Sequence, residues 1–303
     1  MLSIHPLSAD TAARLTAASL DPHAIASLIE TALVEDLADG VDVTSAATIP
    51  EGQRCVVTFG ARDAGVVAGL PVAVGVIDMV CGDDTTVEYL ATDGDRVERG
   101  MPVARVAAPT RAMLTAERTA LNLLCHLSGI ATLTRRWADQ LDDTSAKVRD
   151  TRKTLPGLRA LQKYAVRCGG GSNHRMGLFD MALVKDNHVA AAGGIAEAYA
   201  AVIDLEDTMP VEIEVDDLAS LRIAIEAGAD EVLIDNFSTD DMRAAVAVRD
   251  EMNPAVLLEA SGGLTLESAA AVAATGVDYI AVGELTHSVR VLDLGLDWET
   301  IDD

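Results

Sequence analysis

The stretch VEIEVDDLASLRIAIEAGADEVLIDN, residues 211–236, decides the fold that the sequence predicts. Near its two ends, 212–215 (EIEV) and 233–235 (LID) carry β-branched and apolar side chains among acids, and these segments are predicted to be the ends of strands. Between them, residues 217–227 carry apolar side chains at helical spacing. A strand, a helix and a second strand in close succession are typical of a βαβ unit, in which the two strands are parallel.

The same alternation continues through the second half of the chain. Further strand ends are predicted at 149–150, 184–185, 257–259 and 280–282, and further helices at 158–168, 240–252 and 266–274. Four predicted strand ends carry Glu214, Asp235, Glu259 and Gly283, which lie 21, 24 and 24 residues apart. A (β/α) barrel builds its active face from such strand ends. An open doubly wound sheet is the alternative, but no GxGxxG follows a predicted strand, so we favour the barrel.

The first part of the chain predicts helix followed by mixed α/β structure. Helices are expected at 22–37 and 71–79, and strands at 53–59, 65–68, 87–92 and 103–107. An Asp-Gly turn signal follows the strand at 87–92 and separates it from the strand at 103–107. A long helix is predicted at 112–140, where Arg118 shares a face with Leu114, Leu121 and Cys125. Burying an unpaired arginine is costly, so Arg118 is predicted to meet a partner or a ligand.

The charge of the chain is strongly acidic. It has 48 Asp and Glu against 23 Lys and Arg, a formal net charge of −25, and only four of its cations are lysines. Such a charge repels nucleic acid and anionic membranes, and it is typical of a surface adapted to concentrated salt, so we expect a halophilic source. The sequence has no long apolar run and no basic cluster before an apolar segment at its start, so the expected localisation is cytoplasmic.

One segment reverses this charge. Residues 150–175, DTRKTLPGLRALQKYAVRCGGGSNHR, hold six Lys and Arg and a single acid. Basic side chains on the predicted helix could pair with nearby acids. This explanation fits poorly for Arg152-Lys153 and His174-Arg175, because they flank the helix at its strand and loop junctions. Arginine matches carboxylates with two hydrogen bonds and lysine serves as a point charge for phosphate. The segment therefore predicts a strongly anionic ligand with carboxylate and phosphate groups.

Acidic and small residues at other strand ends complete this prediction. Glu214 and Asp235 are expected to lie beside the basic segment, where carboxylates and substrate oxygens together suit Mg²⁺; two structural salt bridges are the alternative. Ser261-Gly262-Gly263 follows a predicted strand and precedes a helix expected to begin near Thr265. Small residues there allow backbone N–H groups to approach a phosphate.

These segments together resemble the quinolinate phosphoribosyltransferase family. The resemblance runs in order from about residue 25 to near the C-terminus. It is carried by Glu117-Arg118-Thr119 with Leu121-Asn122, by SGIAT at 128–132, by DTRKTLPGLRALQKYAVRCGGGSNHRMGLFDMALVKDNH at 150–188, and by EIEVD, LIDNF, EASGG and GELTHS. The central run is long enough to be highly specific.

The resemblance implies an α/β fold with two domains. An N-terminal α/β sandwich-like domain would span residues 1–120, with the tail 289–303 returning to it, and an incomplete (β/α) barrel of the type II phosphoribosyltransferase kind would span 121–288. The protein would be a homodimer, or a higher oligomer, in which Arg118 reaches the substrate site of the partner subunit.

The resemblance also implies the substrates and the residues that hold them. Quinolinate would react with phosphoribosyl pyrophosphate, with Mg²⁺ as the cofactor at Glu214 and Asp235, to give nicotinate mononucleotide, CO₂ and pyrophosphate in de novo NAD biosynthesis. Lys153, Lys185, Glu214 and Asp235 would be catalytic. The substrate-binding residues would be Arg118, Thr151, Arg152, Lys153, His174, Arg175, Lys185, Glu214, Asp235, Ser261, Gly262, Gly263 and Gly283.

Other functions remain open at this point. A related type II phosphoribosyltransferase could act on nicotinate or another pyridine or pyrimidine acid, or belong to the molybdenum-associated branch of the family. A Schiff-base aldolase could use Lys185 as its nucleophile, but it would not explain Arg118, Arg152 and Arg175 together. A ligand sensor on an inactive barrel is a third, non-enzymatic hypothesis.

Overall fold

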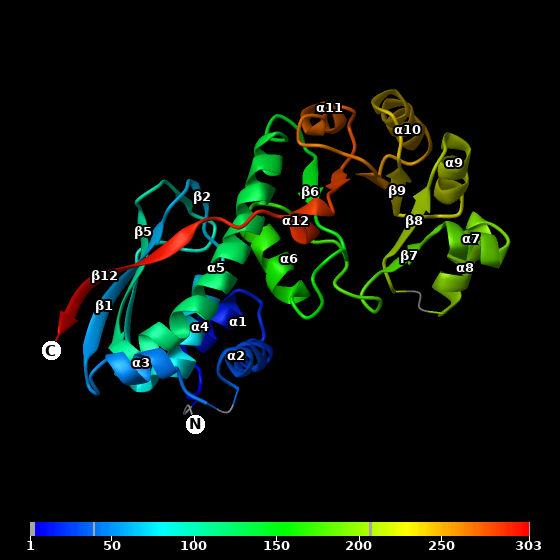
Figure 1. Ribbon diagram of the computed structural model, residues 1–303. Coiled ribbons are helices and arrows are strands. Elements are labelled where there is room, and N and C mark those ends of the chain that lie inside the picture. The colour runs from blue at the N-terminus through cyan, green and yellow to red at the C-terminus, as the bar shows by residue number, and fades with distance from the viewer. Residues whose placement is uncertain (1–3, 39, 206–207, 303) are drawn as a thin grey trace. The chain divides into compact units, whose positions relative to one another are not determined.

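The structure is a computed structural model, and it describes residues 4–38, 40–205 and 208–302 (Figure 1). The chain divides into two compact units. Unit 1 comprises residues 1–133, 160–169 and 289–303, and unit 2 comprises residues 134–159 and 170–288. The long helix α5, Thr110–Asp139, begins in unit 1 and ends in unit 2, so the boundary expected at residue 120 lies inside this helix. No described helix is both long enough and apolar enough to cross a membrane.

Unit 1 is built on an antiparallel sheet of four strands. The strand order is β12 (Leu294–Asp302), β1 (Arg54–Ala61), β5 (Pro102–Pro109) and β3 (Thr86–Tyr89). A second, two-stranded sheet pairs β2 (Gly65–Val66) with β4 (Arg96–Val97). The C-terminal strand β12 pairs antiparallel with β1, so the last strand of the sequence joins the sheet formed by strands of its first half (Figure 1).

Helices supply the rest of the core of unit 1. They are α1 (Ala9–Ala17), α2 (Pro22–Leu37), α3 (Val43–Thr48), α4 (Leu70–Cys81), the first part of α5, and α6 (Arg159–Cys168), with a 3₁₀ turn at Gly82–Asp84. The helix predicted at 22–37 is confirmed, because Pro22 occupies the first turn and Asp21 accepts a hydrogen bond from the backbone of His23. Helix α4 is apolar apart from Asp78, and all its residues but Pro71 are buried.

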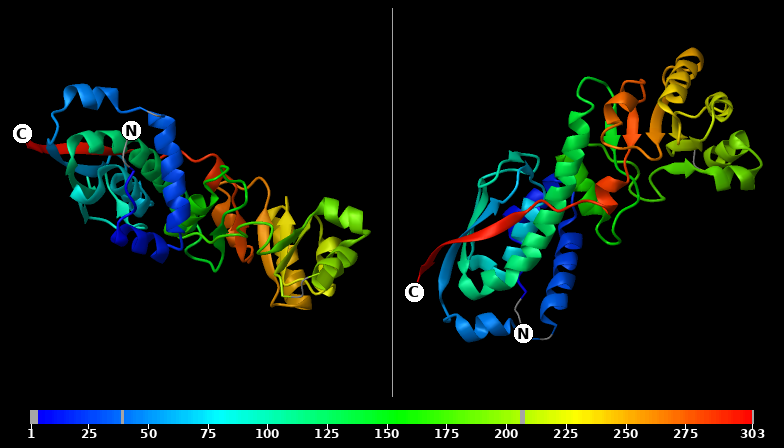
Figure 2. Two further views of the ribbon diagram at one scale, coloured as in Figure 1. Left: turned by 90° about the horizontal axis from the view of Figure 1, so that it is seen from below. Right: turned by 45° about the horizontal axis from the view of Figure 1, so that its top comes forward.

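Unit 2 holds a parallel sheet of six strands, as the alternating pattern predicts. The strand order is β6 (Lys147–Arg149), β11 (Tyr279–Ala281), β10 (Leu257–Ser261), β9 (Glu231–Asp235), β8 (Val211–Val215) and β7 (Ala182–Val184). The helices between the strands are α7 (Asp186–Ala192), α8 (Ile195–Leu205), α9 (Leu218–Glu226), α10 (Thr239–Met252) and α11 (Ala269–Ala273), and α12 (Glu284–His287) follows β11. Figure 2 shows these helices beside the strands in two further views. The arrangement is an incomplete (β/α) barrel.

Helix α11 is shorter than the sequence predicts. A helix was expected to begin near Thr265, directly after the Ser-Gly-Gly segment, but α11 begins at Ala269. The hydroxyl of Ser268 donates to the carbonyl of Thr265 and accepts the backbone N–H of Thr265, and these bonds hold a turn instead. The expectation that a helix N-terminus lies directly behind residues 261–263 is therefore wrong.

Candidate active site

The carboxyl ends of the parallel strands border a cavity of about 300 Å³, which we call the cationic cavity. Polar or charged residues follow directly on several strands. They meet around one cavity because parallel strands all end at the same edge of the sheet. The lining comes entirely from unit 2: Thr151, Arg152, Lys153, His174, Arg175, Leu183, Lys185, Glu214, Leu233, Glu259, Ser261 and Ala281.

Four cations line this cavity: Arg152, Lys153, Arg175 and Lys185. The pKa of Arg175 is lowered by its burial and by the positive charge of Arg152. One guanidinium nitrogen of Arg175 donates to the carbonyl of Met181 at 3.0 Å, and the Nε atom of Arg152 is buried without a hydrogen-bond partner. Neighbouring guanidinium groups with unused donors are suited to bind a ligand that carries carboxylates.

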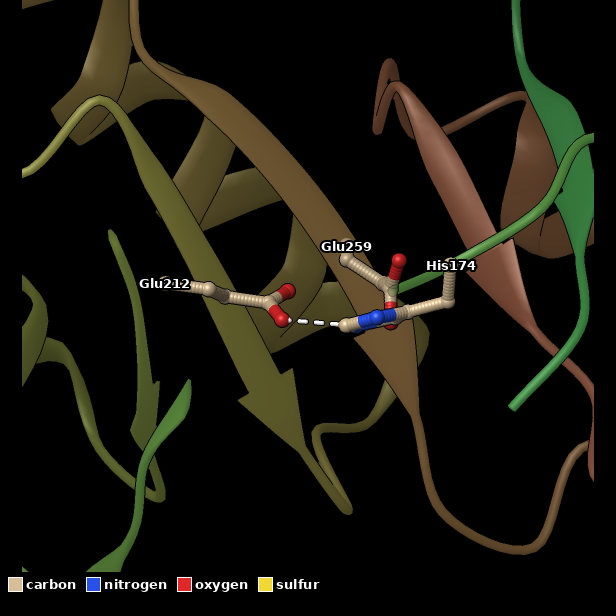
Figure 3. A group of neighbouring side chains, drawn as sticks. All are labelled: His174, Glu212 and Glu259. Atoms are coloured by element: carbon tan, nitrogen blue, oxygen red, sulfur yellow. Dashed lines mark hydrogen bonds and ion pairs between the residues drawn. The ribbon is translucent and has the colours of Figure 1, made fainter. Parts of the chain in front are cut away.

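Below these cations, three buried side chains form a cluster inside the barrel: His174, Glu212 and Glu259 (Figure 3). Nε2 of His174 lies 2.7 Å from Oε2 of Glu212 and 3.6 Å from Oε1 of Glu259. Burial raises the pKa of both carboxyl groups well above the ordinary range, and repulsion from Glu212 adds to the effect on Glu259. We refer to these three residues as the interior cluster.

Arg149 supplies the compensating charge for the interior cluster. Its guanidinium donates to Oε2 of Glu259 at 2.7 Å and is paired with Glu231, and it stacks on the ring of Tyr279 with 3.6 Å to the ring centre. A histidine and two carboxylates are a set of donors that could hold a metal ion. Here, however, the hydrogen bond from His174 and the guanidinium of Arg149 already engage one oxygen of each carboxylate.

A second cavity, of about 400 Å³, shares Thr151, Lys153, Ser261 and Ala281 with the first; we call it the glycine cavity. Its further lining is Asp235, Asn236, Gly262, Gly263, Leu264, Val282, Gly283, Glu284 and His287. A Cβ atom on Gly262 would lie 2.2 Å from Oδ1 of Asn236, and the φ angle of Gly262 is +93°. Glycine is therefore required where this backbone turns toward the cavity.

A third cavity, of about 350 Å³, has an acidic lining that includes Asp186, Glu214, Asp216 and Asp235. Glu214 lies on β8 and is ion-paired with Nζ of Lys185, and Asp235 ends the neighbouring strand β9 and accepts a hydrogen bond from the side-chain amide of Asn236 at 2.6 Å. The oxygens of Glu214 and Asp235 thus border one space. Carboxylates in this arrangement fit a Mg²⁺ ion that also takes oxygens from a substrate.

Twelve of the thirteen substrate-binding residues expected from the sequence line the cationic or the glycine cavity. The thirteenth, Arg118, lies in unit 1 on α5, and its side chain is exposed. Sequence reasoning gave no role to Arg149, Glu212, Asn236 or His287. Glu259 was expected at a strand end of the active face and lines the cationic cavity, but it was given no role, and Glu212 was noted only as a strand residue. Charged residues inside an apolar strand pattern could have drawn attention to both.

The fold and these cavities define a class of protein: a two-unit α/β protein whose incomplete barrel has a cavity lined by cations at the carboxyl ends of its strands. Residues 42–128 match the family described as quinolinate phosphoribosyl transferase, N-terminal domain, and residues 130–297 match its C-terminal domain. The chain belongs to the quinolinate phosphoribosyltransferase family.

Individual relatives agree with this membership. The chain is 54% identical over 270 residues to nicotinate-nucleotide pyrophosphorylase [carboxylating] of Mycobacterium leprae, covering 89% of this chain and 95% of that protein. It is 43% identical over 268 residues to a probable nicotinate-nucleotide pyrophosphorylase [carboxylating] of Bacillus subtilis, covering 87% and 90%. The solved structure of the nicotinate-nucleotide pyrophosphorylase from Francisella tularensis superposes with a TM-score of 0.87 at 39% identity, covering 91% of this chain and 96% of that one.

Proposed function

We propose that this protein transfers phosphoribose from phosphoribosyl pyrophosphate to quinolinate with decarboxylation, yielding nicotinate mononucleotide, CO₂ and pyrophosphate in de novo NAD biosynthesis. The observation that carries the proposal is the cationic cavity, where Arg152, Lys153, Arg175 and Lys185 converge in a chain of net charge −25. The names of the relatives support the same reaction. A dianionic pyridine and a polyphosphate are the ligands that such a potential attracts.

The two adjoining cavities suit the two substrates. The guanidinium groups of Arg152 and Arg175 would bind the quinolinate carboxylates in the cationic cavity. Backbone groups at 261–263 and Gly283 would hold the phosphate of the ribose donor in the glycine cavity. Lys153 lines both cavities and would bridge the two substrates.

The reaction follows from this placement of charge. The pyridine nitrogen forms a bond to the anomeric carbon of ribose while the bond from that carbon to pyrophosphate breaks. Lys153 and Lys185 stabilise the departing negative charge. The bond to the carboxylate next to the ring nitrogen then breaks, and the cationic ring holds the remaining electron pair until a proton replaces the CO₂. Positioning and electrostatics supply the catalysis, and no strong base is needed.

A Mg²⁺ ion at Glu214 and Asp235 is part of this proposal. Glu214 and Asp235 would hold the ion, which would supply positive charge for the oxygens of pyrophosphate. Both carboxylates border the acidic cavity, and the ion pair between Glu214 and Lys185 keeps a cation beside the same site.

The aldolase hypothesis is disfavoured by the environment of Lys185. A Schiff-base lysine must present a neutral amine to its substrate. The Nζ atom of Lys185 is instead paired with the carboxylate of Glu214, an arrangement suited to a charged ammonium. Borohydride trapping with a carbonyl substrate should therefore label no lysine.

Product formation tests the proposed reaction. Purified protein is incubated with phosphoribosyl pyrophosphate, Mg²⁺ and either quinolinate or nicotinate, in low and in molar KCl. Quinolinate-dependent nicotinate mononucleotide with an equal amount of CO₂ is the expected result. Turnover of nicotinate alone would instead assign the sister activity, and binding of quinolinate without turnover at any salt concentration would support a ligand sensor.

A further inference from the structure

The ring of His174 is engaged through both of its nitrogens. The backbone N–H of Arg175 donates to Nδ1 at a distance of 2.7 Å, so Nδ1 is an acceptor and carries no proton. The ring proton must then lie on Nε2, which is 2.7 Å from Oε2 of Glu212. These two contacts select the neutral Nε2–H form of the imidazole.

The segment that carries His174 is anchored to the end of strand β6. The backbone N–H of His174 donates to Oδ1 of the buried Asp150 at 2.9 Å, and the side-chain amide of Asn173 donates to Oδ2 at 2.6 Å. The hydroxyl of Ser172 donates to the carbonyl of Val148 at 3.1 Å. The backbone before the ring is therefore fixed, so the orientation of the ring depends on what its two nitrogens meet.

Glu259 closes the other side of the ring. Its side chain has no exposed area, its Oε1 atom lies 3.6 Å from Nε2 of His174, and Arg149 holds its second oxygen. Glu212 and Glu259 come from β8 and β10, two strands that flank β9 in the sheet. The two carboxylates therefore meet the ring from separate strands, as Figure 3 shows.

We propose that Glu212 and Glu259 are positioning residues for the quinolinate site: they hold the neutral Nε2–H form of His174, and His174 in turn fixes Arg175 in the cationic cavity. Arg175 is then held at both ends, by Nδ1 of His174 at its backbone N–H and by the carbonyl of Met181 at its guanidinium. His174 acts through Arg175 rather than as a positive charge. The naming of quinolinate as the ligand rests on the function proposed above.

The first test is independent of turnover. In free protein with ¹⁵N-labelled histidine, the imidazole signals of His174 are assigned by their loss in His174→Gln. The expected signature is an unprotonated, pyridine-type Nδ1 and a protonated, pyrrole-type Nε2 at neutral pH. A protonated Nδ1, or an imidazolium with both nitrogens protonated, would overturn the proposal, and so would an unprotonated Nε2 bound to a metal ion. None of these outcomes depends on whether the protein turns over quinolinate.

Variants of Glu212 then separate positioning from mere stability. Glu212→Leu removes the acceptor for Nε2–H, so the KM for quinolinate should rise about tenfold or more while the KM for phosphoribosyl pyrophosphate stays within about twofold. Glu212→Gln keeps an acceptor oxygen and should restore most of the affinity and the tautomer signature. Glu226→Leu, at an exposed acid on α9, is the matched control.

The split between the two KM values decides the outcome. Folded Glu212→Leu with an unchanged KM for quinolinate contradicts the proposal, and so does an equal rise in both KM values. Failure of Glu212→Gln to rescue would show that the negative charge, rather than the acceptor, is what His174 requires, and this result also overturns it. If Glu212→Leu does not fold, the tautomer measured in the unmodified protein still decides.

Discussion

The phenol oxygen of Tyr164 lies 2.5 Å from Oδ2 of Asp93, and in unit 1 Tyr164 is buried while Asp93 is half-buried. The same carboxylate accepts the backbone N–H groups of Gly69 and Leu70, at 2.7 and 3.0 Å, at the beginning of helix α4. Burial raises the pKa of Asp93 in spite of these hydrogen bonds. One carboxylate thus joins the start of α4 to α6, two elements distant in sequence.

Tyr164→Phe should lower the free energy of unfolding by about 1–2 kcal/mol, because the carboxylate of Asp93 loses one of its three donors without gaining water. The measurement is urea unfolding followed by circular dichroism. Tyr199→Phe is the matched control, since the hydroxyl of Tyr199 donates to the carbonyl of Gly228 at a more exposed position. Equal losses in the two variants would contradict a special role for the buried bond.

The stability of the protein should also depend on pH through Glu259. Its pKa is raised by burial and then by Glu212, with the guanidinium of Arg149 acting in the opposite direction. The folded state therefore keeps this proton to a higher pH than the unfolded state does. The resulting stabilisation is full below the ordinary carboxylate pKa and is lost as pH rises toward the folded value, with a slope of at most about 1.4 kcal/mol per pH unit.

Urea unfolding at a series of pH values in constant salt measures this slope. Glu259→Gln cannot titrate and should flatten the fall in stability above the ordinary carboxylate range. A variant curve parallel to that of the unmodified protein would show that Glu259 is ionised in the folded state throughout.

Gly262→Ala should damage the glycine cavity more than Gly263→Ala does. Both glycines have positive φ angles, but a Cβ atom on Gly262 would meet the backbone and side chain of Asn236, whereas one on Gly263 has no atom within 4 Å. The φ angle of Gly263, +59°, lies in the left-handed region that an L residue can adopt, whereas that of Gly262, +93°, lies outside it, so both backbone strain and the clash act against alanine at 262. We expect the KM for phosphoribosyl pyrophosphate to rise about tenfold or more in Gly262→Ala relative to Gly263→Ala. Steady-state kinetics at saturating quinolinate check this, and equal KM values would refute it.

Local sequence signals predicted most of the barrel. The strand expected at 212–215 and the helix expected at 217–227 correspond to β8 and α9, because each has its own periodicity and Asp217 caps the helix. Helix α8 and strand β12 were not predicted as elements. For β12 the reason is physical: its hydrogen bonds go to β1, more than two hundred residues earlier, and no local pattern encodes that pairing.

The site was predictable to the extent that its residues follow strand ends. Lys185, Glu214 and Asp235 stand at such ends, so the topology of a parallel sheet brings them together. The interior cluster was not predictable in this way. Arg149 and Glu259 are 110 residues apart, and their pairing exists only because β6 and β10 both flank β11.

Stability should increase with salt if the net charge of −25 reflects adaptation to a saline cytoplasm. At low ionic strength acidic groups repel one another over about 10 Å or more, and molar salt reduces this range to about 3 Å. We expect the Tm to rise by about 5 °C or more between 0.1 and 2 M KCl. NaCl at the same ionic strength controls for a specific effect of potassium. A Tm that is flat or falling would contradict the halophilic interpretation.

Two inactive variants should restore activity when mixed, if Arg118 acts on the site of a partner subunit. Arg118→Ala alters unit 1, and Lys185→Ala alters the cationic cavity of unit 2. In a mixed dimer one site would combine an intact cavity with an intact Arg118, and the other site would carry both defects. Random exchange at equal concentrations makes half the dimers mixed, so about one quarter of the unmodified activity should return.

Differently tagged subunits, separated by affinity after mixing, would establish that exchange has occurred. Activity that stays at the level of the separate variants, despite proven mixed dimers, would mean that Arg118 does not complete the site of its partner. Arg99→Ala, at an exposed arginine of unit 1 outside the resemblance motifs, is the control and should retain activity before mixing. Recovery must also require both partners, because an excess of either variant lowers the fraction of mixed dimers and with it the recovered rate.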